Sequence, residues 1–239
     1  MTIGTLLAEG KNKLVYLTDE EDKCVVRFGD EAMAYNGLKR RIIPGKGKIH
    51  NAVCCRFFEL LRDAGVPVHY LSRYSETEML VKRVEILPVS VVVRNLAAGE
   101  FCDRMGVPEG RQLSHPVTEY HYRRDGIMPM VNSYHITALN IMTDEELEFL
   151  RGLSLQANGI LLDFLVKLGV DLVDLRFTFG KTPDGEVVIA DEITPASCRF
   201  RDAKTGEKLD LDIFRYEMGD IAAAYADLAR RVLGEDAGL

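Results

Sequence analysis

The first third of the chain alternates short β-prone runs with polar turns, a pattern that predicts mostly strands. Between the second run and the third, apolar residues recur at helical spacing from Ile49 to Ala64. Gly65 and Pro67 follow directly, so this helix is expected to end there. The segment 29–47 combines mixed charge with several glycines and is expected to be a long loop. The strands expected in this part of the chain are 13–17, 23–28, 79–84 and 89–94.

Further along the chain, the regular spacing of apolar residues weakens and then returns. The segment 99–142 scatters Gly, Pro, His and Tyr, and is expected to be mostly loop. Thr143 and Glu146 have the spacing of a Thr-x-x-Glu capping box, which predicts the start of a long helix. Gly169 is expected to form its C-terminal cap. Two strands and a closing helix are expected after it, at 171–179, 186–191 and 214–232.

The order of these elements indicates an α+β (α/β) fold with two lobes in one compact unit. The β-rich N-terminal lobe is expected at 1–84, and the mixed C-terminal lobe at 85–239. With 239 residues, the chain is long enough to bury a sizeable core without a metal ion or a disulfide to hold it together.

Composition narrows the classes of protein that remain. The chain carries 30 Lys and Arg against 37 Asp and Glu, which argues against a surface built to hold nucleic acid or an anionic membrane. No run of about 18 apolar residues is present, so no transmembrane helix is expected. The N-terminus lacks the pattern of a signal peptide. Five scattered cysteines without a Cys-x-x-Cys pair indicate reduced thiols and a cytoplasmic location.

The run Gly10-Lys11-Asn12-Lys13 leads directly into the first expected strand. Its glycine lets the backbone approach an anion, while the lysines at i and i+2 point to one face of the strand. This arrangement suits the phosphate tail of a nucleotide. It is not a P-loop, because the Gly-x-x-x-x-Gly-Lys-Ser/Thr spacing is absent. Taken alone, the run is also typical of a solvated, basic start of a strand.

The apolar strand 188–190 ends in two consecutive carboxylates, Asp191 and Glu192, and a turn with Pro195 follows. Carboxylates at the end of a strand commonly hold Mg²⁺ against the phosphates of ATP. An acidic pair that only caps a turn would have the same sequence. The pattern by itself leaves both interpretations open.

Two arginines are further candidates. Arg94 directly follows the apolar run 91–93, and Arg199 directly follows Cys198. A guanidinium in such a place can present its fork to a carboxylate or a phosphate, but a structural ion pair fits equally well. Asp174 and Arg176 alternate with apolar residues, so they share one face of a strand. That face is either solvent or a cleft, and periodicity cannot decide between them.

These motifs are more specific as an ordered set than singly. The set comprises 10–16, 34–37, 46–47, 81–84, 91–99, 109–110, 172–174, 185–193 and 198–199. Its most specific parts are the strand-Arg-Asn-x-x-Ala-Gly motif and the Ala-Asp-Glu-Ile-x-Pro motif. In order and spacing, the set resembles the SAICAR synthetase (phosphoribosylaminoimidazole-succinocarboxamide synthase) family, from about residue 8 to about residue 233.

The resemblance implies a two-lobed, ATP-grasp-like fold with ATP between the lobes. It also implies an ATP-dependent carbon–nitrogen ligase of de novo purine biosynthesis. ATP would activate the carboxylate of 5-aminoimidazole-4-carboxylate ribonucleotide (CAIR) as an acyl phosphate, and the amine of L-aspartate would displace phosphate to give SAICAR. The implied partners are these small molecules, with no nucleic acid and no membrane; a homodimer is left open.

The resemblance further assigns ATP and Mg²⁺ as cofactors. Lys11 and Lys13 would neutralise the ATP phosphates, with Gly10 and Val15 in the same nucleotide site, and Lys82 would lie beside the adenine. Asp191 would hold Mg²⁺, with Glu192 as a second contact. The implied catalytic residues, which would clamp and contact the imidazole nucleotide, are Arg94, Asp174, Arg176 and Arg199.

Several positions depart from the family pattern. Thr178 stands where the family has a Glu on the Mg²⁺ side, and Arg176 stands where it has a Lys. Met128 and Ala196 each stand where it has an Asp. These departures keep an alternative open, namely a paralogous ATP-dependent amide ligase with a different carboxylate or amine substrate.

Glu100 is the sharpest departure, because the family has a Ser there that helps to hold the substrate's phosphate. A carboxylate cannot donate a hydrogen bond and would repel that phosphate. We expect Glu100 to be paired with a nearby cation, either Arg104 or Arg201. An outward orientation and a substrate without the phosphate are the alternatives.

Overall fold

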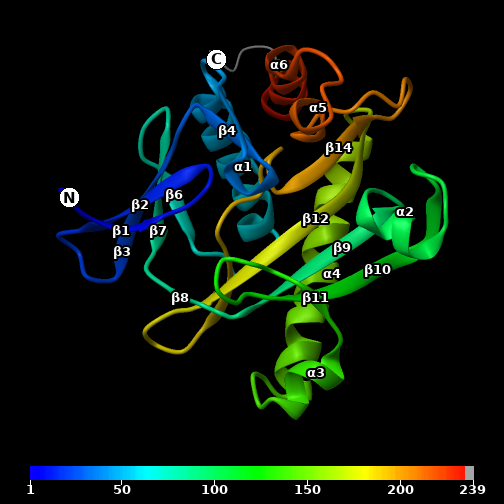
Figure 1. The fold of residues 1–239 in the computed structure, drawn as a ribbon. Helices are drawn as coiled ribbons and strands as arrows, with labels where there is room; N and C mark the ends of the chain where they lie inside the picture. The colour runs from blue at the N-terminus through cyan, green and yellow to red at the C-terminus, as the bar shows by residue number, and fades with distance from the viewer. Residues whose placement is uncertain (235–239) are drawn as a thin grey trace.

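Two large antiparallel sheets lie beside each other, with helices packed between and against them (Figure 1). The computed structural model describes residues 1–234, apart from the side chain of Asn36. The sheets meet where the segment 67–69 runs parallel to β13 (Val187–Ala190). There the amide of His69 donates to the carbonyl of Ile189, and the amide of Ile189 donates to the carbonyl of Pro67, both at 2.9 Å.

The first sheet has the strand order β1-β2-β3-β7-β6 and contains the strands predicted at 13–17, 23–28 and 79–84. β1 was not predicted, because its side chains are mostly exposed and do not alternate between core and solvent. The strands of this sheet are β1 (Ile3–Glu9), β2 (Lys13–Thr18), β3 (Lys23–Phe28), β6 (Tyr70–Arg73) and β7 (Glu78–Lys82).

The second sheet has the order β11-β10-β9-β12-β13, and β8 and β14 also pair with β12. β12 is its longest strand, with 12 residues. The predictions at 89–94, 171–179 and 186–191 are confirmed by β9, β12 and β13. Besides β13, the strands are β8 (Glu85–Ile86), β9 (Val89–Leu96), β10 (Gln112–Tyr122), β11 (Met130–Val131), β12 (Val170–Lys181) and β14 (Cys198–Asp202).

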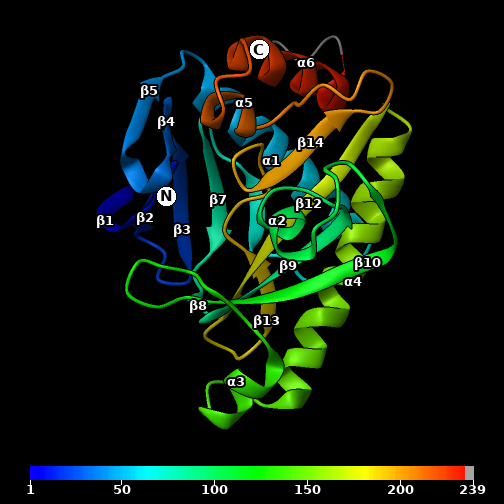
Figure 2. The ribbon, with the colours of Figure 1, turned by 45° about the vertical axis from the view of Figure 1, so that its right-hand side comes forward.

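Two long helices hold the sheets together. α1 (Lys46–Asp63) packs against β3, β6 and β7 of the first sheet and against α4 and α6. α4 (Asp144–Val166) packs along one face of the second sheet, over β9 and β12 (Figure 2). Both were predicted, and the expected capping box at Thr143 is present. The other helices are η1 (Tyr35–Gly37), α2 (Glu100–Met105), α3 (Ser133–Ala138), α5 (Asp212–Arg215) and α6 (Ile221–Leu233).

Among the described residues, α4 is the one helix whose length and mean hydropathy would allow it to cross a membrane. Its residues Leu147, Leu150, Ala157 and Leu161 are buried in the protein core. A core helix of this kind meets the same criteria, so they are weak evidence for a membrane span.

One continuous hydrophobic core joins the two sheets. Val26 of β3, Phe57 of α1 and Phe177 of β12 all belong to the same buried cluster. Along the chain, β7 is the last strand of the first sheet and β8 is the first strand of the second sheet. Residue 84 lies between them. The lobe boundary at residue 84 stays a prediction, and residues 235–239 of the C-terminal lobe lie outside the described residues.

β12 separates the apolar core from a polar face. Leu175 and Phe177 are fully buried in the core cluster on the side of α4. Asp174, Arg176 and Thr178 alternate with them and therefore point to the opposite face. This polar face of the second sheet carries most of the residues singled out in the sequence.

Two segments expected to be loops contain strands. The segment 29–47 includes the hairpin of β4 (Glu31–Ala34) and β5 (Lys39–Ile42). The segment 99–142 includes the 11-residue strand β10, which pairs with β9. β10 was missed because one of its faces carries charged residues that are buried in ion pairs, so the apolar–polar alternation of an ordinary strand is weak.

The helix expected at 214–232 is divided into α5 and α6. Gly219 lies between them with a φ of 139°, a conformation that favours glycine. Asp220 then caps α6, because its side chain accepts hydrogen bonds from the amides of Ala222 (2.9 Å) and Ala223 (3.3 Å). The apolar residues therefore keep helical spacing across residues 216–220, where the helix is interrupted.

Candidate active site

Lys13 joins the two sheets through the carboxylates at the end of β13. Lys13 begins β2, and Asp191 and Glu192 directly follow β13. The Nζ atom of Lys13 lies 2.5 Å from Oδ1 of Asp191 and 2.6 Å from Oε1 of Glu192. Thr194 donates its hydroxyl to the other carboxylate oxygen of Glu192, at 2.6 Å. Two motifs that the sequence separates by 179 residues therefore meet at one point.

The charges at this point stabilise one another. Burial alone would raise the pKa of Glu192, but the ammonium of Lys13 and the hydroxyl of Thr194 lower it below the usual value. Burial alone would lower the pKa of Lys13, and the two carboxylates more than offset this, so the net shift is upward. Nearby Lys46, fully buried in the first turn of α1, has a pKa lowered by burial to about 8.

Asp191 and Glu192 fit a divalent cation that arrives with phosphate ligands. They offer anionic oxygens, the ligands that Mg²⁺ prefers, and they already converge on one cationic group, the ammonium of Lys13. Asp191 has a φ of 74°, a left-handed conformation that is costly for a non-glycine residue and is found at functional sites. In residues 1–234, no group of three or more His, Cys, Asp and Glu could hold a metal ion. Two carboxylates suffice for Mg²⁺ when phosphates supply further ligands.

The other members of the glycine–lysine motif surround Lys13. The amide of Gly10 donates to the carbonyl of Lys13 at 2.8 Å, which closes the turn between β1 and β2. Lys11 is exposed on this turn, and Val15 is half-buried on β2. Lys11 lies in the turn before β2 and Lys13 on β2 itself, so it stays a prediction that both ammonium groups point to one face.

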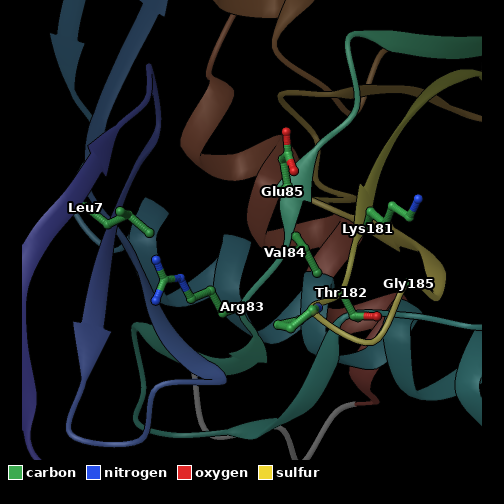
Figure 3. A pocket seen from close by; sticks show the side chains of 8 residues that line it. Leu7, Arg83, Val84, Glu85, Lys181, Thr182 and Gly185 are labelled. Carbon is green, nitrogen blue, oxygen red and sulfur yellow. The ribbon is translucent and has the colours of Figure 1, made fainter.

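A pocket of about 600 Å³ opens beside the segment 83–85, which links the two sheets. Figure 3 shows Leu7 of β1 on one side of this pocket and the turn between β12 and β13 on the other. Lys82 precedes the linking segment and lies 2.9 Å from Glu186, which follows the turn. The pocket is lined by Leu7, Arg83, Val84, Glu85, Lys181, Thr182, Pro183 and Gly185.

Arg94, Asp174 and Arg199 form a row across the second sheet. In the strand register, Asp174 of β12 is opposite Arg94 of β9 on one side and Arg199 of β14 on the other. Oδ2 of Asp174 accepts hydrogen bonds from Nη1 of Arg94 at 2.7 Å and from Nη1 of Arg199 at 2.9 Å. Asp174 and Arg94 are 4 % and 5 % exposed, whereas Arg199 at the end of the row is partly exposed, so the row runs from the interior toward the surface.

Further charged residues extend this row. Nε of Arg94 donates to Oε2 of Glu119 at 2.8 Å, and Arg104 also pairs with Glu119. Nε of Arg199 donates to Oδ2 of Asp212 at 2.9 Å. Burial would raise the pKa of Glu119, but its cationic and hydrogen-bonding neighbours lower it to about 2. The guanidinium groups are thus fixed by carboxylates on both sides and keep their remaining N–H donors for a ligand.

The departures from the family pattern lie on or beside the same face. Thr178 is buried, stands opposite Ala190 in the strand register, and has its hydroxyl 3.5 Å from that of Ser90. Arg176 donates to the sulfur of Met128 at 3.4 Å. The amide of Ala196 donates to the hydroxyl of Thr194 at 3.2 Å, close to Glu192. The substituted positions therefore belong to the site.

The expected ion pair of Glu100 is wrong. Glu100 is exposed at the first turn of α2, and among the described residues it has no charged partner. Arg104 pairs with Glu119, and Arg201 donates to Asp171 at 2.8 Å. Both cations are held by carboxylates nearer to them, so Glu100 adopts the outward alternative.

Glu119, His121 and Asp212 are site residues that the sequence reasoning missed. Glu119 and His121 lie on β10, in the segment expected to be loop, and Asp212 lies in α5. The signal that could have found β10 is the alternation of Val117, Glu119 and His121 with β-prone aromatic residues. Which strand β10 pairs with, and hence that Glu119 meets Arg94, is not visible in the sequence.

The geometry gives the site two ends. A lysine–carboxylate end lies at Lys13, Asp191 and Glu192, and an arginine end lies at Asp174. Asp174 and Thr178 are four positions apart on β12, which corresponds to about 13 Å at the rise per residue of a strand. A phosphorylating nucleotide at one end and an anionic acceptor at the other would meet along the polar face of β12. No serine, cysteine or histidine nucleophile is required for such a transfer between bound molecules.

Comparison with known proteins agrees with this geometry. A family model described as SAICAR synthetase matches residues 6–232. The phosphoribosylaminoimidazole-succinocarboxamide synthase of Coprothermobacter proteolyticus is 47 % identical over 228 residues, which are 95 % of this chain and 97 % of that protein. The enzyme of the same name from Thermoanaerobacter sp. is 45 % identical and covers 96 % of this chain and 97 % of its own.

Solved structures show the same likeness. A SAICAR synthetase in complex with ADP has a TM-score of 0.91 and 38 % identity, covering 95 % of this chain and 97 % of its own. The phosphoribosylaminoimidazole-succinocarboxamide synthase of Ehrlichia chaffeensis has a TM-score of 0.92 and 34 % identity, covering 95 % and 98 %.

Proposed function

Because this chain belongs to the SAICAR synthetase family, we propose that the two ends of its site hold ATP and an imidazole ribonucleotide. The protein is an ATP-dependent carbon–nitrogen ligase of de novo purine biosynthesis. It joins L-aspartate to the carboxylate of CAIR and gives SAICAR, ADP and phosphate. The alternative of an amide ligase with other substrates is not favoured, because the curated relatives that share 40–47 % of their residues with it carry this one name.

In our proposal the adenine of ATP occupies the pocket beside the segment 83–85, next to Lys82. This position is supported by the pocket's volume and by its place between the two sheets. The phosphates then extend toward Lys11 and Lys13, whose ammonium groups offset their charge. Lys13 would leave Asp191 and Glu192 for the phosphates as the nucleotide binds.

Mg²⁺ would be held by Asp191 and Glu192 together with the phosphates of ATP. When bound, it would neutralise the developing charge on the transferred phosphoryl group. Lys13 holds the pKa of Glu192 below its usual range, which keeps this carboxylate ionised.

The imidazole ribonucleotide would lie along the arginine end of the face. Arg94 and Arg199 would direct their free N–H donors to its anionic groups, and Asp174 would accept from its ring substituents. The carboxylate of the imidazole attacks the γ-phosphorus of ATP and releases ADP, and the amine of aspartate then displaces phosphate from the resulting acyl phosphate. Positioning and charge neutralisation supply the catalysis.

The observation that carries this proposal is the meeting of Lys13 with Asp191 and Glu192, in line with the row of Arg94, Asp174 and Arg199. The direct test is ADP release on mixing the protein with CAIR, L-aspartate and Mg²⁺–ATP. Asp191→Asn should abolish most of this rate, whereas Asp163→Asn, which changes an exposed carboxylate on α4, should leave it within about twofold. Release of ADP that does not depend on CAIR would argue against the assignment.

We also propose a cytoplasmic location for this enzyme. All five cysteines are free thiols in the structure, which suits a reducing compartment. Fractionation of the source cells, with an antibody against the chain, would test it.

A further inference from the structure

Arg176 is an incompletely paired cation on the polar face of β12. Its guanidinium is partly buried, and within residues 1–234 no carboxylate lies within hydrogen-bonding distance of it. Its side-chain hydrogen bond goes to the sulfur of Met128, at 3.4 Å, and a thioether is a weak acceptor. Burial and the guanidinium of Arg123 lower the pKa of Arg176 below its usual value. A partly buried guanidinium in such surroundings is expected to bind an anion.

His121 presents a second unused polar atom to the same face. Its Nδ1 lies 3.1 Å from the carbonyl oxygen of Met128, and a carbonyl can only accept, so the proton of the neutral ring is assigned to Nδ1. Nε2 is then a hydrogen-bond acceptor, and within residues 1–234 it is buried without a hydrogen-bond partner. Oε2 of Glu119 lies 3.8 Å from it and would stabilise a positive charge on the ring.

Met128 covers both groups. Its sulfur accepts from Arg176 and its carbonyl accepts from Nδ1 of His121, so one residue occupies a donor of each group and leaves Nε2 of His121 as the open acceptor. It is the half-buried residue of the otherwise exposed segment 123–129 between β10 and β11. A ligand carboxylate is a far stronger acceptor than a thioether, so it would displace the Met128 side chain from Arg176.

The position of these groups points to the substrate they would hold. On β12, Arg176 is two residues from Asp174 of the arginine end and two residues from Thr178 of the lysine–carboxylate end. The reacting carboxyl carbon must lie between those ends, and the attacking amine must approach it there. We propose, on the basis of the proposed function, that Arg176 and His121 form the subsite for the amino-acid substrate, with the guanidinium on a carboxylate and Nε2 on the amino nitrogen.

The proton balance gives His121 a catalytic role. The ammonium of the amino acid gives one proton to Nε2, and the free amine attacks the carbonyl carbon of the acyl phosphate. The new C–N bond forms as the C–O bond to phosphate breaks, and that electron pair leaves with the phosphate. The second proton lost from nitrogen passes to the departing phosphate. Glu119 stabilises the imidazolium until it is deprotonated by water.

The first experiment compares Michaelis constants for the three substrates. Arg176→Gln should raise KM for L-aspartate by at least about tenfold, the loss expected for one charge-assisted contact. KM for ATP and for CAIR should stay within about twofold of wild type, and Arg176→Lys should recover part of the affinity. Arg124→Gln, which removes an exposed guanidinium paired with Asp125, is the matched control. An unchanged KM for aspartate with a raised KM for ATP or CAIR would overturn the subsite.

The second experiment replaces aspartate by hydroxylamine, which traps an acyl phosphate, has no carboxylate and is largely uncharged at neutral pH. His121→Phe should lower kcat with aspartate by at least about tenfold, and should lower the hydroxylamine-dependent release of ADP far less. Equal losses with both amines would remove His121 from the proposal. If wild type releases no ADP with either amine, the proposed function itself fails, and this outcome is distinct from failure of the subsite.

Discussion

At the scale of single residues, the nucleotide end of the site depends on Lys13. Its ammonium now neutralises Asp191 and Glu192, and in the proposed complex it neutralises phosphate. Lys13→Ala should therefore weaken ADP binding by about 1–3 kcal/mol, the cost of a lost charge-assisted contact. Titration calorimetry with ADP measures this. Lys23→Ala, which removes a lysine of the same sheet paired with Glu20, should bind ADP like wild type. Equal affinities in both variants would contradict the assignment.

A buried carboxyl beside the arginine end predicts an unusual pH dependence of stability. Burial and the neighbouring Asp212 raise the pKa of Asp210 to about 7, although it accepts the amides of Phe200 and Asp212. Since the folded pKa lies above the unfolded value, the stability that this group contributes is complete below about pH 4 and is lost as the pH rises toward 7. Its size is on the order of 4 kcal/mol.

Asp210→Asn should flatten the free energy of unfolding between about pH 4 and pH 7, because the amide does not titrate. Urea denaturation at several pH values measures the slope for both proteins. Asp63→Asn, at the exposed end of α1, serves as the control and should keep the slope of wild type. A variant with the same slope as wild type would show that Asp210 is ionised in the folded protein.

At the scale of elements, the turn before α2 controls the position of Arg199. Gly99 has a φ of 55°, and a Cβ there would lie 3.0 Å from Nη2 of Arg199. Gly106, at the other end of α2, has a φ of 63° with no atom within 4 Å of such a Cβ. Both alanine substitutions should cost about 1 kcal/mol or more of stability through backbone strain. Only Gly99→Ala should also raise KM for CAIR. Steady-state kinetics of the pair separates the two effects, and equal KM values would count against the contact.

The start of α4 gives a test of stability without a change in the site. The hydroxyl of Thr143 accepts from the amide of Glu146 at 3.2 Å, and the amide of Thr143 donates to the carboxylate of Glu146 at 2.9 Å. Thr143→Ala should lower the free energy of unfolding by about 1 kcal/mol, whereas Thr143→Ser should lose little. Chemical denaturation measures both. A loss of the same size in both variants would mean that the hydroxyl does not cap the helix.

Elements with one apolar stripe were predictable and elements with buried charge were not. α1 and α4 have long stripes with clear end signals, and β9 and β12 follow dense runs of apolar residues. β10 was interpreted as loop because Tyr120 and Tyr122 face the core while Glu119 and His121 are buried on the opposite, polar face, so neither face has the apolar pattern of an ordinary strand. The individual candidates Arg94, Asp174 and Arg199 were found, but their alignment in one row depends on strand pairing, which periodicity does not encode.

At the scale of the whole molecule, the two lobes should unfold together. A single core cluster includes residues of both sheets and both long helices, and the backbone bonds between 67–69 and Ile189 join the sheets. Thermal unfolding followed by far-UV circular dichroism and by tyrosine absorbance should therefore give coincident transitions. Two separated transitions would show that the lobes are independent domains. The boundary expected at residue 84 would then divide two units that fold independently, and not only two sheets.

The bond between Lys13 and the end of β13 has a consequence for the order in which the enzyme is loaded. Before any nucleotide arrives, the two carboxylates already have a counterion, supplied by the first sheet. Free Mg²⁺ would have to compete with that ammonium, whereas Mg²⁺–ATP offers the lysine new anionic oxygens in exchange. Metal and nucleotide should thus enter as one species, and the initial rate should follow the concentration of the Mg²⁺–ATP complex. Excess free ATP, which draws Lys13 away and leaves the carboxylates facing phosphate without a metal, should bind poorly and inhibit little.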